Sequence, residues 1–264
     1  MILPKKSLGQ HFLKDRRIVA KIVDAAEINA GDQVLEIGPG KGILTLELAR
    51  RAGKVYTVEL DHRLVEYLKN ELLDFKNITL IEGDILKVPL DFLPSRVKVV
   101  ANIPYKISSP LLDRLFQIKD RIESMTLMVQ KEVADRILAS PGTKDYGPLS
   151  VAAQFHAKVL KVMDVGKHAF FPPPKVVSSV ICLTFFEQEP VPASDRAFFF
   201  KVVKAGFAHR RKSARNSMRD EGFSVEEIDR VFRELEIPHL IRAETFDLRT
   251  FARIADKLLL LSRL

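Results

Sequence analysis

The sequence predicts an α/β domain, in which helices cover both faces of a parallel sheet, followed by a small all-helical C-terminal domain. Apolar strand-like runs alternate with helix-like segments through the first half of the chain, a pattern typical of parallel sheets. A glycine-rich turn joins the first of these runs to a helix-like segment. Residues 187–195, rich in proline and acidic side chains, separate the last apolar run from a tail with helical patterning. We therefore predict domains over residues 1–187 and 188–264.

Composition limits the classes to which the protein can belong. The 264 residues are 47% hydrophobic, which is enough for the core of one large domain and a small second one. The chain has no apolar leader and no apolar run of about 18 residues, so we expect a cytoplasmic protein without a membrane partner. The single cysteine, Cys182, lies in an apolar run, and we expect a buried thiol rather than a nucleophile.

Basic residues exceed acidic ones, and the excess is local. The chain has 42 Lys plus Arg against 34 Asp plus Glu, a net charge of +8. Residues 196–219 contain eight Lys or Arg and no acid. This distribution predicts an anionic partner for the tail rather than a generally basic surface.

The predicted sheet places polar residues and glycines at one edge. Its strand-like runs span residues 33–38, 54–60, 78–84 and 97–103, and helix-like segments span 43–51 and 63–72. Ligands of such sheets bind at the carboxyl ends of the strands. Those ends carry the glycines of EIGPGKG, Glu59, Asp84 and Asn102, so we predict a single site there.

The glycine-rich turn favours one class of ligand. Gly38, Gly40 and Gly42 let the backbone turn sharply and let a ligand approach the amides. Ile43 stands where a dinucleotide fingerprint has a small residue, so S-adenosylmethionine is favoured over a pyrophosphate. The alternative is a turn that only packs a helix against a strand.

Two acidic residues extend this prediction to a nucleoside. Glu59 ends the second strand-like run and can accept hydrogen bonds from both hydroxyls of a ribose. Asp84 follows the third run and can accept from the N6 amino group of adenine. Either residue alone could be a solvated charge, but their coincidence at one edge favours a nucleoside site.

The tetrapeptide Asn-Ile-Pro-Tyr after the fourth run predicts chemistry on an adenine amino group. The side-chain oxygen of Asn102 and a backbone carbonyl of Ile103 or Pro104 could accept its two N–H hydrogens, which favours a pyramidal, nucleophilic nitrogen. Proline offers no competing donor, and Tyr105 can stack on the base. The alternative is an Asn-Pro turn after a strand.

The basic tail predicts an RNA-binding helix. If residues 201–219 formed one helix, five cations would fall within roughly an 80° sector, and Phe199, Val203, Phe207 and Ala214 would face the small domain. Gly206 could break this helix, and a solvated basic face is the alternative. Ser224 and Glu227 predict a capping box, and residues 248–261 predict a further helix. The stripe comprises Lys201, Lys204, Arg211, Arg215 and Arg219, and Arg210 and Lys212 join it as predicted RNA contacts.

Motifs along nearly the whole chain resemble those of the ribosomal RNA adenine N6,N6-dimethyltransferases, in particular the branch that acts on small-subunit RNA. They are KKSLGQHFL, EIGPGKGILT, VELD, GDIL, ANIPYKISSPLL, MVQKEVADRI, YGPLSV, FFPPPKVVSSV and HRRKSARNSM. The resemblance implies a Rossmann-like methyltransferase sheet that uses S-adenosylmethionine without a metal. It implies dimethylation of two adjacent adenosines in a hairpin near the 3′ end of 16S-type ribosomal RNA, during ribosome biogenesis. The implied partner is the immature small subunit, bound by a monomer.

The same resemblance assigns roles to individual residues. Phe170, held by three prolines, would stack on the extruded base opposite Tyr105, with a core phenylalanine as the alternative. His11 stands where many members have Asn, and Ala101 where Gly is common, so only fine cofactor contacts differ. The implied cofactor-binding residues are His11, Leu13, Gly38, Gly40, Glu59, Leu60, Asp84, Ile85 and Asn102.

Other functions remain open at this point. DNA adenine and protein glutamine methyltransferases carry Pro-Pro-Tyr at the corresponding strand, and Ile103 argues against both. A large-subunit RNA dimethyltransferase, which confers antibiotic resistance, is another alternative. The residues of the FFPPPKVVSSV and HRRKSARNSM motifs resemble the small-subunit branch more. A non-catalytic nucleic-acid-binding relative is disfavoured because every cofactor position is kept.

Overall fold

The computed structural model describes residues 2–262, apart from the side chain of Lys6, and divides them into two compact units. The sheet unit comprises the chain up to Ala134 together with Lys158–Phe185, and the helical unit comprises Asp135–Ala157 and the chain from Phe186 onward. Residues 135–157 thus join the C-terminal helices, because Val151 and Phe155 pack into their core. The predicted division after residue 187 differs in this segment. Among the described residues, no helix is long and apolar enough to cross a membrane.

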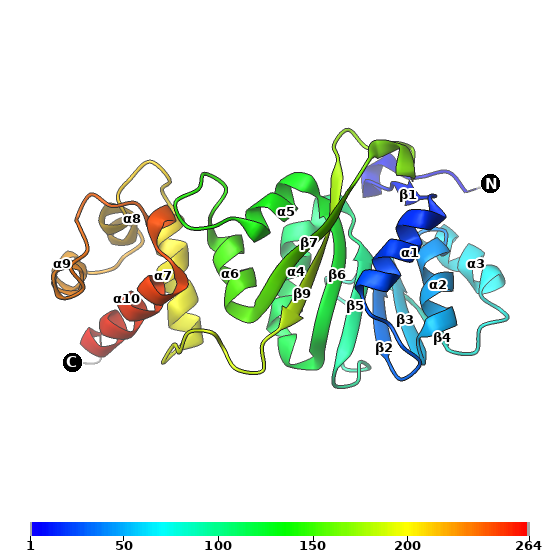
Figure 1. Cartoon of the computed structure of the whole chain (residues 1–264), viewed down its shortest axis with the longest axis horizontal. Coiled ribbons are helices and arrows are strands. Elements are labelled where there is room, and N and C mark those ends of the chain that lie inside the picture. Colours follow the sequence, from blue (N-terminus) through cyan, green and yellow to red (C-terminus); the bar gives the residue numbers. More distant parts are fainter. Residues whose placement is uncertain (1, 263–264) are drawn as a thin grey trace. The chain divides into compact units, whose positions relative to one another are not determined.

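A seven-stranded sheet forms the centre of the sheet unit, in the order β4-β3-β2-β5-β6-β9-β7 (Figure 1). The first five strands of this order pair in parallel, and β9 runs antiparallel to β6. The predicted α/β sheet is confirmed. The strands are β2 (Gln33–Ile37), β3 (Lys54–Glu59), β4 (Ile78–Glu82), β5 (Val97–Asn102), β6 (Ile122–Gln130), β7 (Ala157–Val165) and β9 (Ser178–Phe185).

Side chains on both faces of the central strand β5 are buried, so both faces of the sheet are covered there. Successive residues of a strand point to opposite faces, and residues 97–101 are all buried. Lys98 is among them, and its ammonium donates to the Asp32 carboxylate at 2.9 Å and to the Glu27 carbonyl at 2.8 Å. A strand buried on both faces is typical of a parallel sheet between helical layers.

Helices of the sheet unit begin where the local sequence supplies a cap or a turn. Asp15 and Asp61 accept hydrogen bonds at the starts of α1 and α3. Gly42 precedes α2 with φ of 81°, and a Cβ there would lie 2.8 Å from Leu68 Cδ2, so glycine is required. The helices are α1 (Arg16–Ala25), α2 (Ile43–Arg51), α3 (His62–Glu71) and α4 (Ser108–Gln117), and α5 (Lys131–Leu138) crosses the boundary between the units after Ala134.

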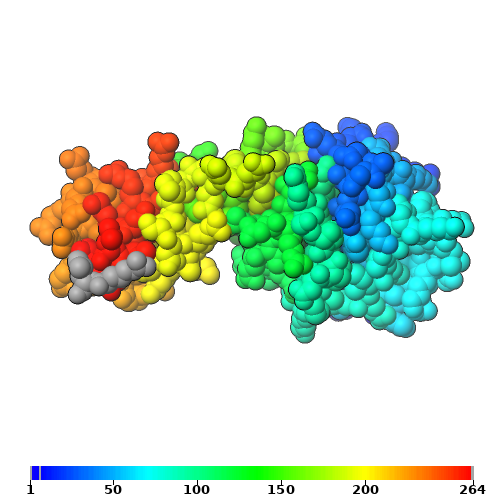
Figure 2. All heavy atoms as spheres, turned by 90° about the horizontal axis from the view of Figure 1, so that it is seen from below, coloured from blue at the N-terminus to red at the C-terminus, as the bar shows by residue number. Residues whose placement is uncertain are grey.

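Two short strands far apart in the sequence form a separate ribbon. β1 (Phe12–Leu13) pairs antiparallel with β8 (Phe170–Phe171), with Phe12 opposite Phe171 and Leu13 opposite Phe170. The N-terminal segment therefore lies beside the segment around residue 170, as the blue and yellow-green regions of Figures 1 and 2 show.

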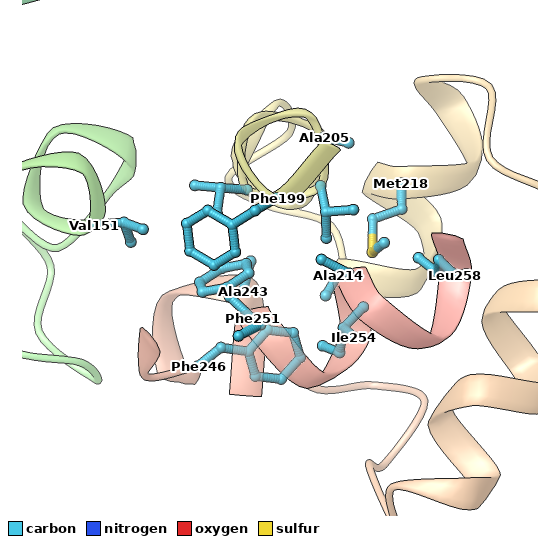
Figure 3. Close-up of a cluster of buried hydrophobic side chains, with 14 of the residues drawn as sticks. Val151, Phe199, Ala205, Ala214, Met218, Ala243, Phe246, Phe251, Ile254 and Leu258 are labelled. Carbon is cyan, nitrogen blue, oxygen red and sulfur yellow. The ribbon is translucent and has the colours of Figure 1, made fainter. Parts of the chain in front are cut away.

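The helical unit is built around aromatic side chains. Phe199 of α7 lies between Val151 of α6 and the Phe246 and Phe251 side chains, and Ala214 and Met218 of α8 complete this side of the core (Figure 3). The predicted packing of Phe199, Val203 and Ala214 is confirmed, since all three are buried. The helices are α6 (Pro148–His156), α7 (Arg196–Phe207), α8 (Ala214–Asp220), α9 (Val225–Glu234) and α10 (Leu248–Leu261).

The structure corrects the single helix predicted over residues 201–219. α7 ends at Phe207, and α8 starts afresh at Ala214 with Ser213 as its N-cap. Gly206 does not cause the break, because it lies inside α7, close to Ala243. Farther on, Ser224 caps α9 by accepting from the Glu227 amide at 3.3 Å, which is one half of the predicted capping box. The predicted helix over residues 248–261 is α10.

Candidate active site

A cavity of about 260 Å³ lies at the carboxyl ends of β2, β3 and β5. Such edges are where parallel sheets bind their ligands. Four of the predicted catalytic residues, Asn102, Ile103, Pro104 and Tyr105, line it, whereas Phe170 does not. The structure also brings every predicted cofactor-binding residue to its wall: His11, Leu13, Gly38, Gly40, Glu59, Leu60, Asp84, Ile85 and Asn102.

The glycine loop forms the floor between β2 and α2. Gly38 and Gly40 have φ of 68° and 59°, which L side chains rarely adopt. A Cβ at position 40 would lie 3.1 Å from the ring of Phe12, so the loop passes close beneath β1. The Gly40 amide donates to Glu59 Oε2 at 3.3 Å and thereby ties the loop to β3.

Glu59 holds a buried carboxylate at the end of β3. Its side chain also accepts from the Asp61 amide at 2.8 Å, which fixes its orientation. The residue is 6% exposed, and burial raises the pKa of the carboxyl above its usual range. Each carboxyl oxygen accepts one backbone hydrogen bond and keeps a free lone pair, the acceptor arrangement that a ribose diol requires.

The wall after β4 combines an acceptor with apolar side chains. Asp84 Oδ1 accepts from the Leu86 amide at 2.9 Å, and this bond holds the carboxylate at the pocket. Ile85 is buried, and Leu60, although exposed, also lines the cavity. An apolar surface with one carboxylate matches the flat face and amino group of an adenine. These acceptors and apolar surfaces fit the expected S-adenosylmethionine.

The Asn-Ile-Pro-Tyr segment lines the cavity at the end of β5. Asn102 Nδ2 donates to the His11 carbonyl at 3.5 Å, which leaves the amide oxygen as the unpaired acceptor among the described contacts. The Pro104 carbonyl accepts from the Ile107 amide at 3.0 Å, and the Ile103 amide donates to Met128 at 3.0 Å. Of the two carbonyls predicted as a second acceptor, only that of Ile103 has no hydrogen bond to a described backbone amide.

Tyr105 is held rigidly beside this segment. Its hydroxyl lies 2.6 Å from Ser178 Oγ, and its ring stacks with that of His11 at a centroid distance of 5.8 Å. His11 Nδ1 lies 2.7 Å from the Pro172 carbonyl. Burial raises the pKa of the Tyr105 hydroxyl, so the ring stays a neutral phenol. The His11 ring covers part of one face of the Tyr105 ring. A target base must therefore stack on the part of the Tyr105 ring that His11 leaves uncovered.

The structure corrects the prediction for Phe170. This ring is 1% exposed and belongs to the core of the sheet unit, because Leu13 pairs with it in the ribbon. A buried ring cannot stack on a base. Its neighbour Phe171 alternates to the opposite side and is 47% exposed.

Glu36 is a buried acid in the pocket wall that the sequence analysis did not single out. No described group lies within hydrogen-bond geometry of its carboxyl oxygens. Burial, with a smaller contribution from the Glu59 charge, raises its pKa to about 7. The hydroxyls of Thr45 and Thr57 oppose this rise without reaching hydrogen-bond geometry. An acid inside the apolar run VLEIG was the available signal.

The predicted RNA-binding side chains of the helical unit fall into two groups. Lys201, Lys204 and Arg211 are exposed, and Lys201 lies over the Phe223 ring at 5.3 Å. The others already have protein partners: Arg215 pairs with Asp229, Lys212 and Arg219 pair with Asp220, and Arg210 donates to the Lys144 carbonyl. Among residues 2–262, no group of three or more His, Cys, Asp or Glu side chains is placed to hold a metal ion.

Comparisons with known proteins agree on one family. A family model described as "Ribosomal RNA adenine dimethylase" matches residues 2–256. A protein of Geobacillus sp. (strain WCH70) named "Ribosomal RNA small subunit methyltransferase A" is 43% identical over 96% of this chain and 91% of its own. One of the same name from Bacillus mycoides (strain KBAB4) is 41% identical over 97% and 91%.

Two solved structures resemble the fold over most of the chain. A dimethyladenosine transferase from Plasmodium falciparum matches with a TM-score of 0.81 and 29% identity, over 92% of this chain and 96% of that one. The 23S rRNA methyltransferase ErmE matches with a TM-score of 0.72 and 27% identity, over 94% and 99%.

Proposed function

The chain belongs to the ribosomal RNA adenine dimethylase family, and from this premise we propose that it dimethylates two adjacent adenosines in a hairpin near the 3′ end of small-subunit ribosomal RNA. It is an S-adenosylmethionine-dependent methyltransferase. Relatives named "Ribosomal RNA small subunit methyltransferase A" are 41–43% identical to this chain, whereas the 23S rRNA methyltransferase ErmE is 27% identical. The higher identity supports a small-subunit target.

The observation that carries the proposal is that the Asn102–Tyr105 segment lines the same cavity as Glu59, Asp84 and the glycine loop. Glu59, Asp84 and the glycine loop would hold the cofactor, which supplies a methyl group on a cationic sulfur when bound. The Asn102 amide oxygen and the Ile103 carbonyl accept the two N–H hydrogens of the target amino group. This holds the nitrogen lone pair out of the ring plane, towards the methyl group.

Tyr105 supplies the surface for the target base. Its hydroxyl is fixed by Ser178, so the ring is already oriented when the base arrives. An adenine must leave its stack to enter the pocket, and stacking on an aromatic ring offsets part of that cost. No general base is required, because the methylated amine is cationic and releases its proton to water.

The helical unit is our proposed RNA-binding module. Lys201, Lys204 and Arg211 are its principal candidates, since their charges are not used by described acidic partners. We further propose that the substrate is the immature small subunit during ribosome biogenesis, bound by a monomer in the cytoplasm.

The proposal is tested with immature small subunits and labelled S-adenosylmethionine, followed by mapping of N6,N6-dimethyladenosine. We expect label at two adjacent adenosines near the 3′ end, and none on immature large subunits. Asn102→Ala serves as the catalytic control, and we expect it to lower the rate by about 100-fold, on the scale of losing one preorganised hydrogen bond in a transition state. If the label appeared only in large-subunit RNA, the protein would instead be a large-subunit methyltransferase like ErmE.

A further inference from the structure

The N-terminal segment of residues 5–13, here called the N-terminal strap, forms one wall of the cofactor pocket. Only its last two residues, Phe12 and Leu13, belong to a strand. The rest of the strap is held by side-chain contacts. The pocket-lining residues of the strap are Ser7, Leu8, Gly9, Gln10, His11, Phe12 and Leu13.

Asp61, which follows β3, is the main anchor of the strap. Its carboxylate is fully buried and accepts from Lys5 Nζ at 3.1 Å and from Gln10 Nε2 at 3.1 Å. The Gln10 amide oxygen in turn accepts from the Lys5 backbone at 2.7 Å, so these two strap residues brace each other. The contacts span 51 and 56 positions in the chain and are tertiary, not local.

The structural roles of Asp61 in the sheet unit do not require the strap. It caps α3, and Arg63 donates to both of its oxygens, at 3.1 and 2.6 Å. Lys5 and Gln10 are therefore additional partners. The Lys5 side chain is 44% exposed, so it can leave the carboxylate for water at little cost, whereas Asp61 cannot.

Asp61 also contacts the ribose-binding acid directly. Its backbone amide donates to Glu59 Oε1 at 2.8 Å, so the same residue holds the strap and orients Glu59. Arg63, Gln10 and Lys5 together hold the pKa of Asp61 well below its usual range, and the anchor stays ionised at any working pH.

We propose that Asp61 is a positioning residue whose contacts with Lys5 and Gln10 close the N-terminal strap over the cofactor, and that release of these contacts sets the rate of cofactor exchange. The inference rests on the proposed function, because each of the four methyl transfers that yield two dimethyladenosines requires a fresh cofactor. Opening at this anchor frees a pocket wall while Glu59 and Arg63 keep their contacts with Asp61. Other contacts also hold the strap: Lys106 donates to the Ser7 carbonyl at 2.7 Å, and His11 Nδ1 lies 2.7 Å from the Pro172 carbonyl.

The test is the dissociation rate of S-adenosylhomocysteine from the full-length protein, measured by rapid-mixing fluorescence or displacement. For Lys5→Ala with Gln10→Ala we expect dissociation at least about tenfold faster, equivalent to about 1.4 kcal/mol. We also expect KM for S-adenosylmethionine to rise. The melting temperature without cofactor should change little, because Arg63 still donates to both oxygens of Asp61.

Arg63→Ala is the matched control, since it removes two bonds to the same carboxylate without touching the strap. We expect near-wild-type dissociation for this control and recovery in Lys5→Arg. Wild-type dissociation rates in both Lys5→Ala with Gln10→Ala and Asp61→Asn would overturn the inference. If the unmodified protein fails to bind S-adenosylhomocysteine at all, the proposed function fails instead, so the two failures are distinguishable.

Discussion

Two adjacent phenylalanines, Phe170 and Phe171, differ in burial and therefore in what a substitution should do. Phe170→Ala opens a cavity in a packed core, and we expect a loss of about 3–5 kcal/mol in the free energy of unfolding. Phe171→Ala removes an exposed ring near the pocket and should leave stability within about 0.5 kcal/mol. If Phe171 stacks on the target base, its loss lowers methylation through RNA binding, on the scale of about 1–3 kcal/mol.

Urea unfolding and steady-state kinetics of both variants check this prediction. Unchanged stability in Phe170→Ala would contradict the burial of that ring. If Phe171→Ala also methylates ribosomal substrate at the wild-type rate, neither ring contributes to base stacking.

Glu36 should make stability depend on pH near neutrality. Burial raises its pKa from 4.5 to about 7, so between these values the folded protein holds a proton that the unfolded chain has lost. The stability that this group contributes is complete below about pH 4.5 and falls by about 1.4 kcal/mol per pH unit until about pH 7. The total is on the order of 3 kcal/mol.

Glu36→Gln, which cannot ionise, should remove this part of the dependence. The free energy of unfolding in urea, measured for both proteins at several values between pH 4.5 and pH 8, checks the difference. Parallel pH profiles for the two proteins would show that Glu36 titrates normally.

At the scale of elements, the predicted RNA contacts are spread over α7, α8 and the segment that connects these two helices, which carries Arg211. Neutralising Lys201, Lys204 and Arg211 together should weaken RNA binding and flatten the slope of log affinity against log salt by about 0.7–0.9 per lost phosphate contact. The paired residues Lys212 and Arg215 form the comparison set. Their neutralisation should flatten the slope less, because their charges are compensated by Asp220 and Asp229.

Salt titrations with matched and mismatched hairpins distinguish the two sets, and S-adenosylmethionine affinity should stay constant throughout. Equal slopes for the wild type and the Lys201, Lys204, Arg211 variant would place RNA binding on other residues.

Elements with strong local signals were predictable from the sequence. The strand ends that carry Glu59, Asp84 and Asn102 follow apolar runs bounded by glycine or polar residues, and the parallel topology then brings them together. The burial of Phe170 was not predictable, because it depends on pairing with Leu13 in a distant part of the chain. The break between α7 and α8 was missed for a similar reason, since the Ala214 amide donates to the Ile241 carbonyl, a tertiary contact.

For the whole molecule, the two acceptors on the target nitrogen predict the order of products. After one transfer the nitrogen keeps a single N–H, so only one of Asn102 and Ile103 can still accept from it. The cofactor must also be exchanged through the strap before the second transfer. We expect N6-monomethyladenosine to accumulate early and then decline, as measured by quenched time courses with mass spectrometry. A course in which dimethyladenosine alone appears would mean that both transfers occur within one encounter.

Pairing of β1 with β8 limits how early the pocket can form in the nascent chain. His11 and Pro172 are 161 positions apart, so at about 5–20 residues per second the ribosome makes β1 roughly 10–30 s before β8 exists. During that interval Phe12 and Leu13 have no strand to pair with, and the wall of the pocket that they form is not fixed. Nascent chains that stop before Phe170 should therefore retain no cofactor, however well their first strands have folded.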